Sequence, residues 1–271
     1  MGGRRIAFVT GASRGIGAAA SIALAERGFD VVATARTVQE GRSADGRPLP
    51  GSLETTKSAV VARGRHCLAI PLDLLEPASI RAAVERVQDE WGAIDVLLNN
   101  GIHTGSGSMD LFLDLTPETL DTLFRANLFA QIDVTQRVLP GMLARGRGVV
   151  INMVSGAAQQ DPPAPANRGG WGFAYAASKA ALLRMAGVLA VEHRDSGVSF
   201  FNVDPGFVIT EAMKLSDPEG LISRRFHPAP ASVPAAAIAW LATDPAAASR
   251  SGETISAQRL CLDLGLHADW R

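Results

Sequence analysis

Arg5-Ile-Ala-Phe-Val-Thr10 runs directly into Gly11-Ala-Ser13-Arg14-Gly15-Ile16-Gly17, and this junction decides the fold. The first stretch is a short apolar run, which is typical of a strand buried on both faces. The second is a glycine-rich turn that opens an Ala- and Leu-rich segment, a predicted helix that Gly28 can end. Strand, turn and helix in this order predict the first βα unit of a parallel sheet.

The same turn is a candidate site for a dinucleotide. Small residues let the backbone approach a pyrophosphate, and the start of the helix presents free N–H groups to its charge. The spacing Gly-xxx-Gly-x-Gly alone fits equally well a glycine turn that only closes a βα unit. Its position after the first buried strand favours a cofactor site. The candidate residues here are Gly11, Ser13, Arg14, Gly15, Ile16 and Gly17.

Apolar runs continue to alternate with segments of helical periodicity along the chain. No internal repeat and no linker interrupts them. This pattern predicts an α/β fold of the Rossmann type: one domain over residues 1–271, with about seven parallel strands in a doubly wound sheet and helices on both faces. The expected strands are 5–10, 30–35, 66–72, 94–98, 148–154, 198–203 and 254–262.

Composition excludes several classes of function. With 47% hydrophobic and 20% charged residues, the chain has the balance of a soluble globular protein. A net charge of −1 without a basic block argues against nucleic acid as a partner. Cys67 and Cys261 have no metal-like spacing, so neither a metal site nor a disulfide framework is expected. We expect no signal peptide and no apolar run long enough to cross a bilayer, and therefore a cytoplasmic protein.

Tyr175 is the only tyrosine, and Lys179 follows it by four positions in an Ala- and Leu-rich segment. On a helix, residues four apart lie on one face, which would place the phenol beside a positive charge. Such a charge lowers the phenol pKa from about 10 and suits the group to general acid/base catalysis. The alternative is a half-exposed tyrosine and a solvated lysine without a catalytic role.

Arg36 ends the second predicted strand, where a NAD site would have an acidic residue for the ribose hydroxyls. Together with Arg14 in the glycine turn, it offers two guanidinium groups, which suit the 2′-phosphate of NADP(H) better than a bare ribose. NAD(H) is the less favoured cofactor. Alternatively, both arginines are ordinary solvated surface residues.

Several short motifs in a fixed order give the chain its resemblance to a known family. These motifs are Thr10-Gly-xxx-Gly15-x-Gly17, Asp73-Leu74, Asn99-Asn100-Gly101, Asn127, Ser155, Tyr175-xxx-Lys179 and Pro205-Gly206-xxx-Thr210. With them, the chain is similar from end to end to the short-chain dehydrogenase/reductase family, a family of Rossmann-fold oxidoreductases. Each motif is weak alone, and their common order is what carries the resemblance.

The resemblance implies four catalytic residues. Tyr175 would protonate the carbonyl oxygen during reduction, or act as the base in the reverse direction. Lys179 would lower the tyrosine pKa and bind the nicotinamide ribose, and Ser155 would hold the substrate oxygen. Asn127 would keep a bend in its helix open to a water that relays protons to Lys179. Without the family, Ser155 could be a simple turn residue at a strand end.

The resemblance also implies further cofactor contacts and a division of labour along the chain. Residues 1–155 would bind the cofactor, and residues 155–271 would hold the catalytic residues and the substrate beneath a lid at 207–232. Thr210 could alternatively be only a helix cap. Beyond the glycine turn, the expected cofactor residues are Arg36, Asp73, Leu74, Asn100, Gly101, Tyr175, Lys179, Pro205, Gly206, Val208 and Thr210.

Two departures from the family pattern stand out. The usual Asn-Asn-Ala-Gly is Asn99-Asn100-Gly101-Ile102 here, which places the contacts around position 101 in doubt. Ser155 and Tyr175 are 20 positions apart, more than is common in the family. The added stretch 159–171 is rich in Pro and Gly, so we expect a loop that forms one wall of the substrate pocket.

The leading hypothesis is an NADP(H)-dependent oxidoreductase that interconverts a carbonyl and an alcohol. Rival hypotheses are a cofactor-sensing binding protein on the same fold, an NAD-linked dehydrogenase, and an enzyme of epimerisation or dehydration. The apolar residues of 207–232 favour an apolar carbonyl substrate: Phe207, Met213, Leu215, Leu221 and Phe226, with His227 as a lid residue. The family resemblance further implies a homodimer or homotetramer.

Overall fold

The computed structural model describes residues 4–41, 48–103, 105, 107–211 and 228–270. Its centre is one seven-stranded sheet in the order β3-β2-β1-β4-β5-β6-β7, and every strand pairing in it is parallel. The predicted doubly wound Rossmann-type sheet is therefore confirmed. The strands are β1 (Ile6–Thr10), β2 (Asp30–Ala35), β3 (Cys67–Pro71), β4 (Val96–Asn99), β5 (Gly148–Met153), β6 (Val198–Asp204) and β7 (Thr254–Ser256).

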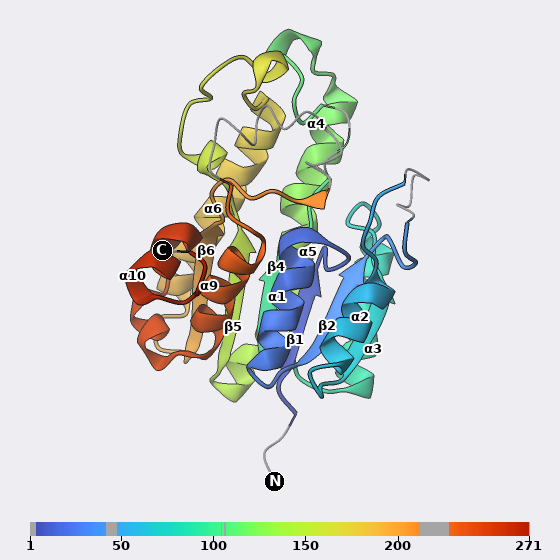
Figure 1. Ribbon diagram of the computed structural model, residues 1–271, viewed down its shortest axis with the longest axis vertical. Coiled ribbons are helices and arrows are strands. Elements are labelled where there is room, and N and C mark those ends of the chain that lie inside the picture. The colour runs from blue at the N-terminus through green and yellow to red at the C-terminus, as the bar shows by residue number, and fades with distance from the viewer. Residues whose placement is uncertain (1–3, 42–47, 104, 106, 212–227, 271) are drawn as a thin grey trace.

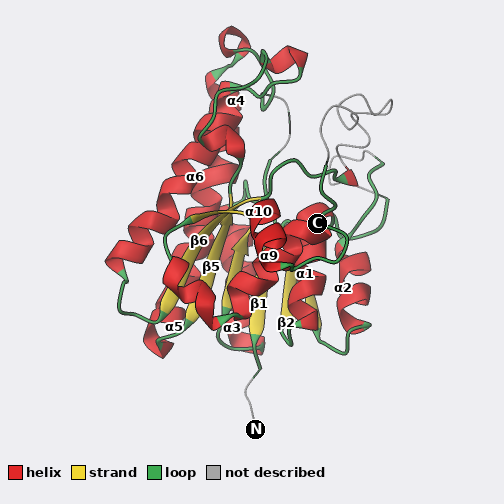
Figure 2. Ribbon diagram, turned by 60° about the vertical axis from the view of Figure 1, so that its left-hand side comes forward, coloured by secondary structure: helices red, strands yellow, loops and turns green. Residues whose placement is uncertain are grey.

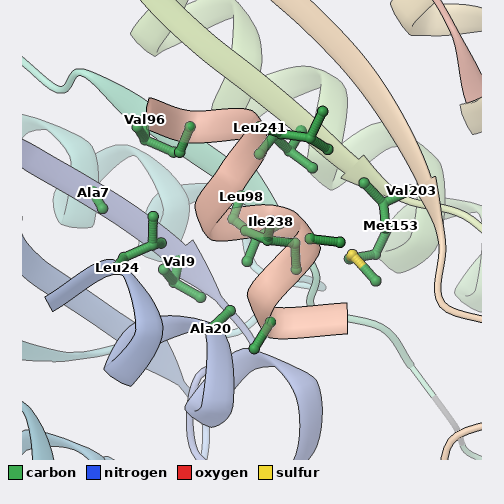
Figure 3. Packing of buried hydrophobic residues seen from close by; sticks show 14 of the residues in the cluster. Ala7, Val9, Ala20, Leu24, Val96, Leu98, Met153, Val203, Ile238 and Leu241 are labelled. Carbon is green, nitrogen blue, oxygen red and sulfur yellow. The ribbon is translucent and has the colours of Figure 1, made fainter. Parts of the chain in front are cut away.

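Helices cover both faces of the sheet, as a parallel sheet requires (Figure 1). One face is covered by α1 (Gly15–Glu26), α2 (Leu53–Val61), α9 (Ser232–Thr243) and α10 (Ala257–Leu264). The other is covered by α3 (Pro77–Glu90), α5 (Ala130–Arg145) and α6 (Phe173–Glu192). On the first face, Leu24 of α1 and Ile238 of α9 meet Val9 and Leu98 of the sheet (Figure 3). Each such fully buried side chain contributes about 1.5–3 kcal/mol to folding.

The helix that enters α5 changes its winding at Asn127. α4 (Pro117–Phe124) continues through a π-helical turn at Arg125–Phe129 into α5. A π-turn inside an α-helix disturbs the regular backbone hydrogen bonds and is frequent at functional sites. The irregularity predicted at Asn127 is therefore present. α4 lies beyond the carboxyl ends of the strands in both views of the molecule (Figures 1 and 2).

Residues 254–262 were expected to be a strand throughout, and this prediction was wrong after Ser256. β7 ends there and α10 begins at Ala257. The buried residues of α10 are Ala257, Leu260 and Cys261, whose spacing of three and four is that of a helix. Only Thr254-Ile-Ser256 pairs with β6.

Four polar side chains form a row of hydrogen bonds across the face of the sheet that α5 and α6 cover. Asn99 Nδ2 donates to Asn152 Oδ1 at 3.0 Å, and Asn152 Nδ2 donates to Asn202 Oδ1 at 3.3 Å. Asn202 Nδ2 then donates to Thr254 Oγ1 at 3.3 Å and to the Leu183 carbonyl of α6 at 2.7 Å. The four ladder residues are direct partners in the strand register. We call this row the amide ladder.

α6 corrects one expectation about membranes. It has 20 residues and a mean hydropathy of 1.3 in its most apolar window, which meets the length and composition of a membrane span. The expectation that no apolar run is long enough to cross a bilayer was therefore wrong. The same length and composition occur in core helices of soluble proteins, and α6 packs against β5 and β6. Only 28% of the window is fully buried, most of the other residues of α6 are half-buried, and Val188 and Val191 are exposed.

Candidate active site

The glycine turn between β1 and α1 has room only for glycine at its closest points. A Cβ on Gly17 would lie 2.3 Å from the Gly11 carbonyl oxygen, and one on Gly11 would lie 2.7 Å from Gly101 Cα. Gly11 also has a φ of 68°, which disfavours other residues. The turn and the end of β4 are therefore packed backbone against backbone, as a close approach to a pyrophosphate requires.

The atypical Asn99-Asn100-Gly101-Ile102 segment is held in place by Thr10. The backbone N–H groups of Asn100 and Gly101 both donate to Thr10 Oγ1 at 2.9 Å. Asn100 Nδ2 donates to the carbonyls of Thr10 and Gly11 at 2.9 and 3.2 Å. The departure from the family pattern thus leaves a well-bonded turn that still borders the cleft.

A cleft of about 290 Å³ opens above this turn at the carboxyl edge of the sheet. It brings together most of the predicted cofactor residues: Gly11, Ser13, Arg14, Gly15, Ile16, Arg36, Asp73, Leu74, Asn100, Gly101 and Thr210. Gly17 packs beneath the turn. A larger hollow of about 540 Å³ lies between the end of α6 and Ser251, and it borders none of the predicted site residues.

The two arginines at the adenine end of the cleft differ in their surroundings. Arg14 holds the segment before α2: its guanidinium donates to the carbonyls of Pro50 at 2.8 Å and Gly51 at 2.7 Å. It makes longer contacts of 3.4 Å to the Leu49 carbonyl and 3.5 Å to Thr37 Oγ1. Arg36, by contrast, is exposed at the cleft. Of the two, Arg36 is the more accessible to a phosphate.

A carboxylate lies at the start of α1, where the pyrophosphate of a dinucleotide would bind. The Gly15 N–H donates to Glu211 Oε2 at 3.0 Å. Helix N-termini attract anions because their first N–H groups have no partner within the helix. Glu211 thus places a carboxylate where the fold favours a phosphate. The backbone N–H groups at the start of α1 are donors that would also suit a phosphate.

Tyr175, Ser155 and Lys179 meet where β5 ends beside α6. The Ser155 side chain hydrogen-bonds the Tyr175 phenol. Lys179 is 3% exposed, and its Nζ donates to the Met153 carbonyl at 2.7 Å. The structure therefore brings these three predicted catalytic residues together from two elements.

The predicted pKa of Tyr175 is corrected for the chain without a bound cofactor. Burial raises the pKa of the phenol, the negative charge of Asp204 raises it further, and the Ser155 hydrogen bond opposes both. Lys179 is not a permanent cation either, since burial lowers its pKa to about 8. The expected lowering of the tyrosine pKa assumed that nearby positive charge outweighs burial of the phenol, whereas burial is the larger effect.

Asn127 connects the π-turn to the rest of the site. Its Oδ1 accepts from the His103 N–H at 2.8 Å, and its Nδ2 lies 3.4 Å from Ser178 Oγ on α6. Ser178 Oγ in turn donates to the Tyr175 carbonyl at 2.9 Å. Asn127 is fully buried, and it links the β4 loop with the helix that carries Tyr175.

The Pro205-Gly206 turn lies at the end of β6 and is held by Gln258 of α10. Gln258 Nε2 donates to the carbonyls of Pro205 and Phe207 at 3.0 and 3.1 Å. Val208 forms a parallel bridge with Ala229. Pro205, Gly206 and Val208 do not line the 290 Å³ cleft, whereas Thr210 does. The expected lid residues Met213, Leu215, Leu221, Phe226 and His227 lie outside the described residues.

Several residues at the site were not predicted. Gln131 holds the Gly101 carbonyl at 2.9 Å, His103 lines the cleft, and Asp204 acts on Tyr175. Asp204 had a signal in the sequence, because it ends a strand immediately before the Pro-Gly motif. Gln131 and His103 had none, since their roles follow from the packing of α5 and the β4 loop.

Comparison with known proteins places the chain in a family. The family model for short chain dehydrogenases matches residues 5–219. The chain is 31% identical over 208 residues to Oxidoreductase UcpA of Escherichia coli (strain K12), covering 76% of this chain and 70% of that protein. It is 32% identical over 257 residues to the 3-oxoacyl-(acyl-carrier-protein) reductase FabG of Vibrio cholerae, covering 93% and 94%.

A solved structure agrees with these relatives. A putative short-chain alcohol dehydrogenase from Sinorhizobium meliloti 1021 matches with a TM-score of 0.75 at 27% identity, covering 94% of this chain and 95% of that one. The chain belongs to the short-chain dehydrogenase family, and it is an oxidoreductase that acts on small molecules. The family uses NAD or NADP, and the cleft over the glycine turn is lined by most of the residues predicted to bind such a dinucleotide.

Proposed function

We propose that the protein reduces a carbonyl compound to an alcohol with NADPH, or catalyses the reverse reaction with NADP⁺. The observation that carries this proposal is that the Tyr175–Ser155 pair lies at the same carboxyl edge of the sheet as the cleft that the exposed Arg36 borders. Neither Tyr175 nor Ser155 lines the cleft itself. The similarity to ketoacyl reductases supports reduction of a carbonyl, and their name is no more than a guide to the substrate.

The chain's own residues divide the work as follows. The glycine turn and the start of α1 bind the pyrophosphate, Arg36 binds the 2′-phosphate, and Asp73 with Leu74 borders the adenine. Bound NADPH supplies the hydride. The Ser155 hydroxyl donates to the substrate oxygen and holds the carbonyl carbon in place, which makes the step effectively intramolecular.

Tyr175 supplies the proton. The raised pKa keeps the phenol protonated at neutral pH, which suits a general acid for reduction. The hydroxyl gives its proton to the substrate oxygen as negative charge develops there. Lys179, with a pKa of about 8, can then return a proton towards Tyr175, and Asn127 holds the neighbouring turn.

We also infer the wider setting of the enzyme. The cofactor half 1–155 and the catalytic half 155–271 share the one sheet, which supports a single domain. Most of the expected lid at 207–232 lies outside the described residues. Val188 and Val191 of α6 are 44% and 67% exposed, and a homodimer or homotetramer would cover them. A cytoplasmic location agrees with free cysteines at Cys67 and Cys261.

A panel of aldehydes and ketones tests the function when NADPH oxidation is followed. Wild-type protein should turn over apolar carbonyl compounds, and Tyr175→Phe should bind NADPH normally but show no turnover. If the wild type bound NADPH without reducing or oxidising any member of a broad panel, the cofactor-sensing alternative would be favoured. If NADH served as well as NADPH, the NAD-linked alternative would be favoured.

A further inference from the structure

Asp204 is the last residue of β6, at the edge of the sheet where the catalytic residues lie. Side chains along a strand alternate between its two faces. Asn202, two residues earlier, bonds the Leu183 carbonyl of α6, so the side chain of Asp204 lies on the same face of the sheet as α6. This is the helix that carries Tyr175 and Lys179.

The two carboxylate oxygens of Asp204 have different surroundings. Oδ1 accepts from the Gly206 N–H at 3.0 Å, which fixes the side chain against the Pro-Gly turn. Oδ2 lies 3.5 Å from the point where a Cβ on Gly156 would be, and Gly156 directly follows Ser155. Gln160 Oε1 lies 3.8 Å from the same point. Two acceptor oxygens therefore border the space beside Ser155.

Asp204 places a carboxylate at this position. The described residues offer it no ion pair, and the carboxylate is partly exposed to solvent. Its charge reaches the Tyr175 phenol and favours the neutral, protonated form. A carboxylate fixed beside Gly156 would also act on any charged group that a substrate carries near its carbonyl.

We propose that Asp204 selects the substrate: its Oδ2 accepts a hydrogen bond from an ammonium or hydroxyl group near the reacting carbonyl, and its charge disfavours a carboxylate at that position. The inference rests on the proposed carbonyl reduction and names the class of substrate within it. The preferred compounds have an apolar body and an amino or hydroxyl group within a few bonds of the carbonyl. Keto acids with a carboxylate at that position are poor substrates.

The test uses three ketones of one skeleton that carry an ammonium, a methyl or a carboxylate group at the same position. For wild-type enzyme at low salt, we expect kcat/KM to fall in that order, by at least tenfold from the ammonium to the carboxylate compound, or about 1.4 kcal/mol. Asp204→Asn retains an oxygen for the Gly206 N–H but loses the charge, and it should reduce the ratio to within about threefold. Added salt should narrow the wild-type ratio as well, because the attraction is electrostatic.

Asp89→Asn is the matched control, because Asp89 is exposed on α3 and the variant makes the same change in net charge. It should keep the wild-type order and ratio. An equal ratio in wild type and Asp204→Asn would overturn the role of Asp204 while leaving carbonyl reduction intact. Failure to reduce any of the three ketones, the neutral one included, would count against the proposed function itself. If Asp204→Asn did not fold, the salt dependence of the wild-type ratio would decide, and a ratio unchanged by salt would overturn the inference.

Discussion

The Gly15 N–H at the start of α1 donates to Glu211 Oε2 at 3.0 Å, although the two residues are 196 positions apart in the chain. The bond joins the first βα turn to the segment that follows Thr210. It also places a carboxylate among the donors that a dinucleotide pyrophosphate would need. If the cofactor binds as proposed, it competes with Glu211 for the same backbone group.

Removing the charge of Glu211 should strengthen cofactor binding. In Glu211→Gln we expect the Kd for NADPH to fall about fivefold, close to 1 kcal/mol, because a charged acceptor leaves the site and its repulsion of the pyrophosphate is lost. Titration calorimetry measures this directly. Glu85→Gln, an exposed change of the same charge on α3, should leave the Kd unchanged. An unaltered Kd in Glu211→Gln would mean that the contact between Gly15 and Glu211 does not oppose NADPH binding.

Arg36 should contribute to cofactor binding, whereas Arg14 should contribute to the stability of the fold. We expect NADPH to bind at least tenfold more tightly than NADH, about 1.4 kcal/mol, and Arg36→Ala to remove most of that preference without weakening NADH. Arg14→Ala should instead lower the Tm, because Arg14 bonds the carbonyls of Pro50 and Gly51. Equal affinities for the two cofactors in wild type would contradict the assignment of NADP(H).

Tyr175 is the only tyrosine, so phenolate absorbance on titration reports this residue alone. In the cofactor-free protein, we expect it to ionise above the usual value of about 10, because burial raises its pKa. Ser155→Ala should raise the transition further, Asp204→Asn should lower it, and bound NADP⁺ should lower it through its positive charge. A transition below 10 without cofactor would contradict the dominant effect of burial on the phenol.

Lys179 should make stability depend on pH in alkaline solution. Its pKa is about 8 in the folded chain against 10.5 ordinarily, so between these values the unfolded chain binds more protons and the free energy of unfolding rises with pH. The rise is about 3 kcal/mol at most. Lys179→Met should lack this rise, whereas Lys57→Met, on a partly exposed residue of α2, should retain it. Denaturant titrations at several pH values provide the measurement, and parallel curves for wild type and Lys179→Met would refute the assignment.

The segment 159–171 should govern substrate choice and not the chemical step. Among its residues, only Ala166–Arg168 form a short 3₁₀ turn, and much of the segment is exposed. Removing about seven residues there should change the relative kcat/KM among carbonyl substrates while the affinity for NADPH persists. An unaltered substrate ranking would identify the segment as a surface insertion only.

The fold could be predicted closely from the sequence because its signals are local. The apolar run before Gly11 and the glycine spacing after it defined β1 and α1, and each later strand was a short apolar run of its own. The prediction extended β7 too far, because no glycine or proline separates Thr254–Ser256 from the start of α10. Only the spacing of Ala257, Leu260 and Cys261 separates them.

The chemistry of the site was less predictable because it depends on burial and on distant pairs. The spacing of Tyr175 and Lys179 indicated their common face but not the desolvation that sets both pKa values. No local pattern could place Glu211 against Gly15. Because side chains alternate along β6, the sequence indicates that Asp204 and Asn202 share a face of the sheet. It does not indicate that α6 covers this face.

The amide ladder has a consequence for how this enzyme can change during evolution. Ser155 follows Asn152 by three residues and Asp204 follows Asn202 by two, so the ladder sets the height at which both emerge from the sheet. A strand shifted by one residue would point its amide to the wrong face and break the row. The loops beyond these strand ends, 159–171 among them, can therefore vary in length and sequence without realigning the residues that react. The sheet keeps the catalytic residues in place, while changes in the loops can alter substrate specificity.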